Sequence, residues 1–359
     1  MQASVTRMVA DAIDPELTVT TPIGSRVRPR NPRAFDAYIR GLAAYRTATL
    51  DGYREAERGA AECIRLEPSF ARAHTLLGIA RYATLSAVGG VPDATRLQEA
   101  RDDFDTALSH DPDDALAHAN LAGMTFEFDY DWPAAREHYQ RALSLSPQAI
   151  EAYAGGLLLA GHGAEAERQY RRAKDLDPMS LAIRMKLIFT LSVLSRPQEA
   201  LAMVDDLETM APANPAWLPL RAGLWMQSGD TVRAADYVAK LRSAMPTLPQ
   251  LPLAEARLAH LAGLHDEALA KLAAVEPVLG RQYPYAVGAS YAAIGEAGRA
   301  ARFLLDAIAR RDPGAAMIVV DHDLDPIRRA PEFRAVWDAV PNLTVDAVFP
   351  GAVAAQPAP

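Results

Sequence analysis

Cysteine is almost absent from this chain. Cys63 is the single cysteine in 359 residues, which excludes an intrachain disulfide and any metal cluster built from cysteine alone. It lies on an expected helix between Glu62 and Ile64. We therefore interpret Cys63 as a small buried side chain rather than a reactive thiol.

Long apolar stretches and clusters of positive charge are missing as well. No run approaches the roughly 18 apolar residues that a membrane-spanning helix needs, and the N-terminus lacks the basic and apolar pattern of an export signal. The 37 Lys and Arg residues face 45 Asp and Glu, and this formal charge of −8 repels phosphate backbones unless basic residues cluster. We expect a soluble, cytoplasmic chain that neither inserts into a membrane nor binds nucleic acid directly.

The motifs of common catalytic sites are also absent. The chain has no Gly-rich phosphate loop, HExxH, GxSxG or spaced Cys and His set. Asp321, His322 and Asp323 are the most suggestive group, because alternate strand residues point to one side and two carboxylates can share an ion. A solvated loop before the last helix explains them too, and we favour it. We predict no catalytic residue, no cofactor and no metal site.

Helix-forming residues dominate what is present. Half of the residues are apolar but only 7% are aromatic, a composition that favours close-packed helices over sheets. In residues 132–147, WPAAREHYQRALSLSP, Ala135, Tyr139 and Ala142 stand at offsets 0, 4 and 7 and share one helix face. The two alanines allow another helix to approach closely, and Tyr139 fills the space beside them.

The same unit recurs along most of the chain. The first small residues of successive second helices are Ala56, Ala100, Ala135, Ala166, Ala200, Ala234, Ala268 and Ala300, separated by 44, 35, 31, 34, 34, 34 and 32 residues. Twelve residues after the first six stand Pro68, Pro112, Pro147, Pro178, Pro212 and Pro246, each of which ends a helix. A 34-residue helix-turn-helix period is that of the tetratricopeptide repeat, and the resemblance covers about residues 33–312.

Two steps depart from this period. The step of 44 carries ten extra residues around 86–97, which we interpret as a surface loop, with a functional flap as the alternative. The step of 31 is interpreted as a tight turn that replaces the normal inter-helix loop in residues 159–166. His74 and His118 occupy equivalent repeat positions, and we interpret them as packing residues, with a pH-sensing pair as the alternative.

These patterns predict an all-α fold. We expect a right-handed α-solenoid of about eight tetratricopeptide hairpins in residues 32–312, because arrays bury each hairpin against its neighbours. Residues 313–341 would cap its last apolar face. Residues 1–31 would form an N-terminal helix and linker, and residues 342–359 a disordered tail.

Four stretches narrow the resemblance further. Residues 31–45, 70–82, 129–147 and 321–337 resemble the C-terminal repeat region of bacterial winged-helix regulators, class III adenylate cyclases and related kinases. That family's ending resembles a short strand followed by a helix, and Asp325, Pro326, Arg329, Pro331 and Phe333 match its outline. No winged-helix, cyclase or kinase motif is present, so no catalytic or DNA-contacting residue carries over. We expect a stand-alone repeat protein or a piece whose output domain lies elsewhere.

The resemblance also implies where a partner would bind. First helices of such hairpins line the concave wall, and inward repeat positions yield the candidates Arg72, Thr75, Ile79, Tyr82, Leu116, Ala119, Gly123, Phe126, Met185, Phe189 and Ser192. Their mixture of aromatic, aliphatic and small residues suits an apolar peptide or helix. We expect a non-enzymatic regulatory module that binds a protein segment. The alternative is a sensor whose small-molecule ligand changes the shape of the superhelix, and self-association stays open.

Overall fold

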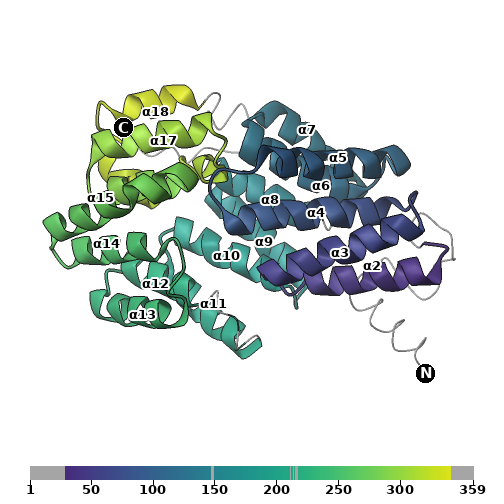
Figure 1. Ribbon diagram of the computed structural model, residues 1–359, viewed down its shortest axis with the longest axis horizontal. Coiled ribbons are helices and arrows are strands. Elements are labelled where there is room, and N and C mark those ends of the chain that lie inside the picture. The colour runs from purple at the N-terminus through teal and green to yellow at the C-terminus, as the bar shows by residue number, and fades with distance from the viewer. Residues whose placement is uncertain (1–28, 147–148, 211, 213, 215–216, 341–359) are drawn as a thin grey trace.

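The computed structural model describes residues 29–146, 149–210, 212, 214 and 217–340. Every regular element in this part of the chain is a helix (Figure 1). The N-terminal helix and linker expected over residues 1–31 lie outside the described residues up to residue 28, and the tail expected over residues 342–359 lies outside them entirely. None of the described helices is both long enough and apolar enough to cross a bilayer.

Eight helical hairpins follow one another in the described chain. Their first and second helices are α2 (Pro32–Tyr45) and α3 (Leu50–Leu66), α4 (Ala71–Val88) and α5 (Ala94–His110), α6 (Ala115–Met124) and α7 (Trp132–Leu145), α8 (Ile150–Leu159) and α9 (Gly163–Leu176), α10 (Leu181–Val193) and α11 (Pro197–Met210), α12 (Trp217–Gln227) and α13 (Thr231–Ala244), α14 (Leu251–Leu261) and α15 (His265–Gln282), and α16 (Pro284–Ala293) and α17 (Ala297–Ala309). The predicted all-α solenoid is confirmed.

The helices of each hairpin pack against each other at small residues. All eight alanines that mark the second helices have no exposed surface. A Cβ atom added at Gly78 would lie 2.9 Å from the ring of Phe104 in the same hairpin, and one added at Gly156 would lie 2.8 Å from the ring of Tyr139. Large residues four positions after the marker thus fill the space that the small residues of neighbouring helices leave, as the repeat pattern predicts.

Capping residues decide where the helices begin and end. Helices α3, α5, α9 and α13 end two residues before Pro68, Pro112, Pro178 and Pro246. Helix α15 has Gly280 at the equivalent position, contains Pro277 in its interior and runs on to Gln282. Asp114 begins α6 by accepting hydrogen bonds from the backbone N–H groups of Leu116 and Ala117.

Two expectations about the irregular steps need correction, the first only in part, since a loop does form at Gly89, Gly90 and Pro92. The ten extra residues lengthen α4 and α5 to 18 and 17 residues, so the connecting loop is only residues 89–93. That loop is not free at the surface either, because the Val91 N–H donates to the Gln282 carbonyl oxygen at 2.8 Å. In the fourth hairpin the three-residue turn after α8 has the ordinary length, and α8 itself is short, with 10 residues.

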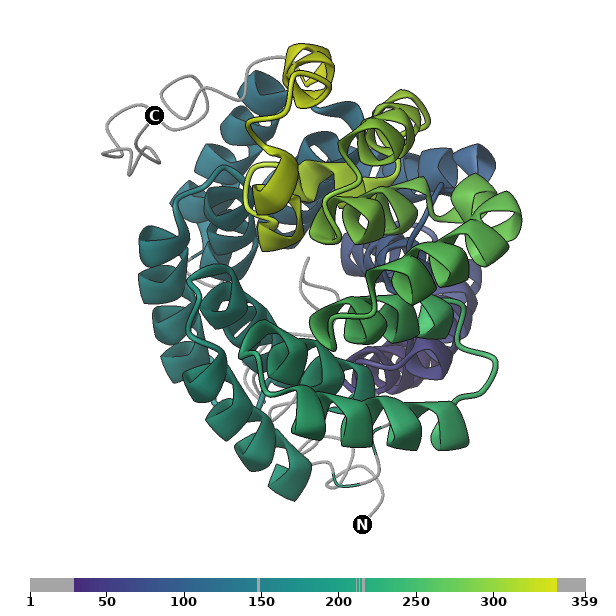
Figure 2. The same ribbon diagram turned by 90° about the vertical axis from the view of Figure 1, so that its left-hand side faces the viewer.

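The superhelix curves until its C-terminal end reaches the middle of the chain (Figure 2). The segment η3 (Pro313–Met317) packs against the π-helical turn η1 (Thr125–Asp129) that ends the first helix of the third hairpin. Arg311 Nη1 donates to the Phe128 carbonyl oxygen at 2.8 Å, and the Tyr130 hydroxyl donates to the Asp312 carbonyl oxygen at 3.3 Å. The solenoid is therefore closed by contacts between residues about 180 positions apart.

The C-terminal cap consists of η3, η4 (His322–Ile327) and α18 (Phe333–Ala339). Helix α18 covers α17 with Phe333 and Val336, which have no exposed surface. The short strand that the family resemblance implies before this helix does not form. Arg328 instead donates to the carbonyl oxygens of Ile318, Val319 and Asp321, and these carbonyls point to one side chain, which the alternation of a strand would not permit.

Replacing Gly78 by valine should destabilise the second hairpin. The new side chain would overlap the ring of Phe104, and overpacking of this kind costs about 1–3 kcal/mol. We expect a lower midpoint of thermal unfolding measured by circular dichroism. Gly298→Ala is the matched control, since nothing lies within 4 Å of its added Cβ and its helix should gain up to about 1 kcal/mol. An unchanged midpoint in Gly78→Val would contradict the packing.

Candidate functional site

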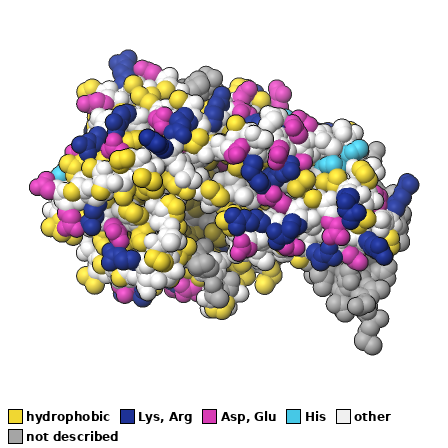
Figure 3. All heavy atoms as spheres, viewed as in Figure 1, with side chains coloured by type: hydrophobic (Ala, Val, Ile, Leu, Met, Phe, Trp, Pro, Cys, Tyr) yellow, Lys and Arg dark blue, Asp and Glu magenta, His cyan; other side chains and the backbone are white. Residues whose placement is uncertain are grey.

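Two adjoining cavities occupy the concave side of the superhelix. The first, which we call the chamber, has a volume of about 450 Å³ and is walled by the first helices of the second to fifth hairpins, the loop at Gly89 and Gly90, and η3. The second has a volume of about 310 Å³ and lies between α12, α14 and α16. They share Gln250, Tyr285 and Ala286. Hydrophobic side chains gather around a hollow near the middle of the face in Figure 3.

Four of the eleven candidate residues from the sequence line the chamber. They are Tyr82, Ala119, Gly123 and Phe189. Gly123 makes room for Tyr82, since an added Cβ would lie 2.9 Å from the tyrosine hydroxyl. Phe189 keeps about a third of its surface exposed, at 36%, so it presents an apolar ring to an occupant.

The other seven candidates do not line either cavity. Thr75, Ile79 and Phe126 are buried, and the Thr75 hydroxyl donates to Asp114 Oδ2 at 2.6 Å. Ser192 exchanges hydrogen bonds with Gln227, through its hydroxyl and its carbonyl oxygen. The remaining three, which lie elsewhere on the first helices, are Arg72, Leu116 and Met185.

A local change of helix type explains why Phe126 is buried. Residues Thr125–Asp129 form a π-helical turn, and its extra residue rotates the side chains that follow. Phe126, expected to face inward, lies in the core with 1% exposure. Its neighbour Glu127 lines the chamber instead. Sequence periodicity missed Glu127 because it assumes a constant 3.6-residue turn.

Glu127 is the chamber's most unusual group. It is half-buried, and its carboxylate accepts a hydrogen bond from the hydroxyl of Tyr82. Burial raises the pKa of Glu127, although the Tyr82 hydrogen bond and the charge of Lys186 both act to lower it. No Lys, Arg or His in the described part of the chain forms an ion pair with this carboxylate.

Lys186 enters the chamber from α10 but already has a partner. Its ammonium lies 2.9 Å from Glu151 Oε1. Burial acts to lower the pKa of Lys186, yet Glu151 and Tyr170 outweigh it and the pKa is raised. Lys186 is therefore a paired cation whose charge Glu151 neutralises.

Two tyrosines from second helices also reach the chamber wall. Tyr139 and Tyr170 stand four residues after their marker alanines, a position that the sequence pattern assigns to packing away from the groove. Glycines of α8 let them through: an added Cβ at Gly156 or Gly155 would lie 3.2 Å from the respective hydroxyl oxygen. Among the described residues, neither hydroxyl has a hydrogen-bond partner.

The second cavity holds residues that sequence reasoning could have found. Met185 and Phe189 stand 15 and 11 residues before the marker Ala200. The same offsets from the next three markers give Pro219, Gly223, Leu253, Arg257, Tyr285 and Ala289, all of which line this cavity. The signal was the repeat period itself, carried beyond the fifth hairpin.

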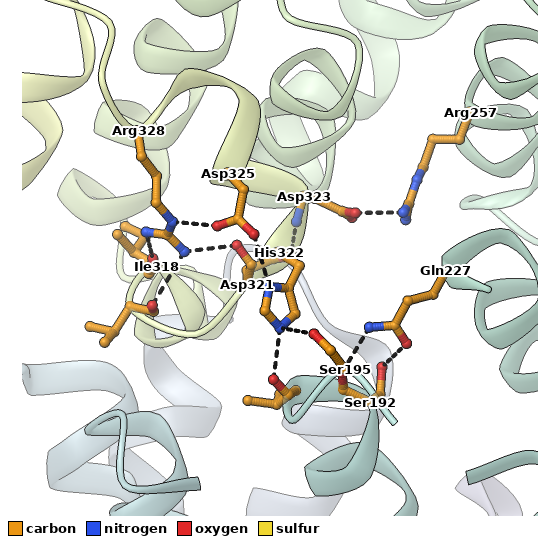
Figure 4. A network of polar contacts seen from close by, with 12 residues as sticks. Ser192, Ser195, Gln227, Arg257, Ile318, Asp321, His322, Asp323, Asp325 and Arg328 are labelled. Atoms are coloured by element: carbon orange, nitrogen blue, oxygen red, sulfur yellow. Dashed lines mark hydrogen bonds and ion pairs between the residues drawn. The ribbon is translucent and has the colours of Figure 1, made fainter. Parts of the chain in front are cut away.

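A polar network connects the cap to the end of α10 and to α14 (Figure 4). His322 Nε2 lies 2.7 Å from the carbonyl oxygen of Val193, at the end of α10, and its Nδ1 lies 2.8 Å from Asp325 Oδ2. Both partners can only accept, so both ring nitrogens carry hydrogen and the imidazole is charged. Burial acts to lower the pKa of His322, but Asp325, the Val193 carbonyl and Asp321 together raise it.

The acidic residues of the cap serve the same closure. Asp321 accepts from the hydroxyl of Tyr285 at 2.7 Å and from the backbone N–H of Asp323 at 2.9 Å. Asp323 pairs with Arg257 of α14. Within the described residues, no group of three or more His, Cys, Asp or Glu is placed to hold a metal ion.

His74 and His118 have a repeated structural contact. Each lies close to the carbonyl oxygen of the proline six residues before it, His74 Nε2 at 2.8 Å from Pro68 and His118 Nε2 at 3.1 Å from Pro112. Arg184 donates to the Pro178 carbonyl oxygen in the equivalent place. The contact holds the turn between consecutive hairpins, in agreement with the packing interpretation.

The hairpins, their period and their closure define a solenoid of the tetratricopeptide type. The chain is similar to Cut9–Hcn1, a hetero-tetramer of the APC/C, with a TM-score of 0.55 and 10% identity over 85% of this chain and 55% of that one. This likeness shows the fold alone, since one fold serves unrelated functions.

Two further solved structures are similar at lower scores. Yeast Tom70 has a TM-score of 0.46 and 15% identity over 93% of this chain and 72% of that one. A tetratricopeptide repeat protein from Parabacteroides merdae has a TM-score of 0.45 and 17% identity over 67% of this chain and 93% of that one. No family model and no curated protein sequence matches the chain.

The cap should loosen when His322 loses its charge. The pKa of His322 is raised in the folded state. Its contribution to the free energy of unfolding is therefore complete below the pKa of the unfolded chain, near 6.5, and is lost as pH rises through the pKa of the folded state. His322→Gln should therefore cost about 1 kcal/mol at pH 6, from lost hydrogen bonds, and less at pH 9. Thermal unfolding at both pH values measures this.

His74→Gln provides the contrast. Burial lowers the pKa of His74, so the free energy of unfolding of the native protein falls as pH falls. The difference in this free energy between the native protein and His74→Gln should therefore become smaller at acid pH. If His322→Gln lowers the free energy of unfolding by the same amount at pH 6 and pH 9, the imidazole of His322 is not charged in the native protein.

Proposed function

We propose that this chain is a non-enzymatic interaction module that binds a protein segment along its concave face. One observation carries the proposal: the chamber and the second cavity adjoin through Gln250, Tyr285 and Ala286. The concave face therefore offers a continuous surface from the second hairpin to the eighth. A short segment in extended or helical form can lie along such a surface.

The walls favour a segment with apolar side chains. Phe189, Leu158 and Met317 line the chamber, and Met226 and Leu253 line the second cavity. Aromatic and methionine side chains adapt to apolar partners at interfaces. Because the cap closes the chamber on one side, the segment would insert a few residues rather than thread through a long open groove.

We place this module in a bacterial signalling or transcription-regulatory system of the cytoplasm. The sequence resemblance of residues 31–45, 70–82, 129–147 and 321–337 to the repeat region of winged-helix regulators and adenylate cyclases supports that placement. In such a system the module would recognise a partner and pass the event to an output domain, while performing no reaction itself.

A second candidate function is a small-molecule sensor. The chamber favours it, because about 450 Å³ falls in the range of small-molecule sites. Its walls come from both ends of the superhelix, including Tyr82 near the start and Met317 in the cap. An occupant would contact both ends and so alter the closure of the solenoid.

Selection of random peptides displayed on phage tests the first function. We expect enriched peptides to bind the purified chain, and Phe189→Ala to weaken them at least tenfold, since Phe189 presents an exposed ring in the chamber. Val278→Ala is the matched control, as Val278 is 73% exposed and lines neither cavity. Peptides that respond to Val278 and ignore Phe189 would place binding on the outer face and refute the proposal.

A thermal-shift screen with a metabolite library tests the sensor. A ligand of the native state at 100 times its dissociation constant adds about 2.7 kcal/mol to the free energy of unfolding. We expect at least one metabolite to raise the unfolding midpoint, and Tyr139→Phe or Phe189→Ala to reduce that rise. Equal rises in the native chain and both variants would exclude the chamber as the site.

A further inference from the structure

The charges around the chamber do not balance. Lys186 is neutralised by Glu151 at 2.9 Å. Asp312 is 2% exposed, and its carboxylate oxygens accept from the backbone N–H groups of Gly314 and Tyr285. Glu127 has the neutral hydroxyl of Tyr82 as its hydrogen-bond partner and forms no ion pair in the described part of the chain, although the charge of Lys186 acts on it. Asp312 and Glu127 both line the chamber without an ion-pair partner among the described residues, and of the two only Glu127 has no backbone N–H donor.

Hydrogen-bond acceptors gather around this carboxylate. Tyr139 and Tyr170 line the same cavity, and neither hydroxyl has a partner among the described residues. Burial raises the pKa of each phenol most, and the charge of Glu127 adds to it, for Tyr170 less than the opposing charges of Lys186 and Glu151. A hydroxyl oxygen and a carboxylate can each accept a hydrogen bond from one donor group.

Another part of the wall is apolar. Phe189, Leu158, Leu159 and Met317 line the chamber, and none of them can hydrogen-bond to a polar ligand. A matching occupant therefore combines several N–H donors and a positive charge at one end with an apolar body at the other.

We propose that the chamber binds a protonated amine, which donates to the Glu127 carboxylate and the hydroxyl oxygens of Tyr139 and Tyr170, with its apolar body against Phe189. The positive charge of the amine pairs with the Glu127 carboxylate. The folded protein then no longer carries an unpaired buried charge when Glu127 is ionised. An anionic ligand would meet a Lys186 ammonium that is already paired with Glu151, and it would lie beside the carboxylate of Glu127.

The inference rests on the proposed function in one respect, that the chamber admits an occupant. The amine is either a free small molecule or the lysine side chain of a bound segment, since both present the same ammonium group. Its recognition at Glu127 is independent of how the second cavity binds.

Isothermal titration of the full chain with three probes of matched shape tests the proposal. The probes are benzylamine, benzyl alcohol and benzoate, which carry a positive, neutral and negative group on one ring. We expect benzylamine to bind and the other two to bind at least tenfold more weakly. Stronger binding of benzoate, with loss of that binding in Lys186→Met, would overturn the proposal in favour of an anion site.

Three variants separate the ammonium site from general effects on the chamber. Glu127→Gln keeps the shape and the ability to accept from Tyr82, and should weaken benzylamine at least tenfold. Tyr139→Phe removes one acceptor and should weaken it about threefold to tenfold. Val278→Ala on the outer surface should have no effect, and circular dichroism confirms that each variant is folded. Unchanged benzylamine affinity in Glu127→Gln would refute the site.

A peptide arm identifies the source of the amine. Where a selected peptide contains lysine, exchange of that lysine for norleucine removes the charge and should weaken binding to the native chain but not to Glu127→Gln. Binding of benzylamine alone assigns the site to a free amine. Peptides that bind through Phe189 while neither benzylamine nor lysine depends on Glu127 would leave the interaction function standing and refute the ammonium site.

Discussion

Close contact between small and large side chains is the constraint on which this structure depends. The marker alanine of each second helix is fully buried, and residues such as Phe104 and Tyr139 fill the gaps beside glycines of neighbouring helices. Helices that meet on alanine and glycine approach closely, which sets the angle within a hairpin and between hairpins. Repeated eight times in the described chain, this geometry produces a curved solenoid.

Curvature then determines where the ends meet. Arg311, just before the cap, contacts the third hairpin, and His322 and Asp323 of the cap contact the fifth and seventh hairpins respectively. Arg328 holds the cap segment together by gathering three backbone carbonyls. A groove that an open solenoid would leave accessible along its length becomes a chamber bounded by both ends of the chain. Any occupant of that chamber is therefore coupled to the closure of the superhelix.

Much of the fold could be predicted, because hairpin packing leaves a local pattern. The markers and prolines located the second helices, and Phe333 and Val336 cover the last hairpin where the cap was expected. The predictions failed where the spacing between marker alanines does not determine whether the extra residues form a helix or a loop. Ten extra residues can lengthen helices as readily as a loop, and α4 and α5 are lengthened because helical hydrogen bonding continues to residues 88 and 94.

The sequence by itself determined the hairpins, their order and the residues that pack them, since these depend on contacts that recur every 34 residues or so. The tertiary structure alone decided the chamber. The π-helical turn exchanged Phe126 for Glu127 at the inner wall, and glycines of α8 admitted Tyr139 and Tyr170. Contacts such as that between Tyr130 and Asp312, 182 residues apart, form because the small rotations between successive hairpins add up along the array. The 34-residue sequence period does not specify the size of this total rotation.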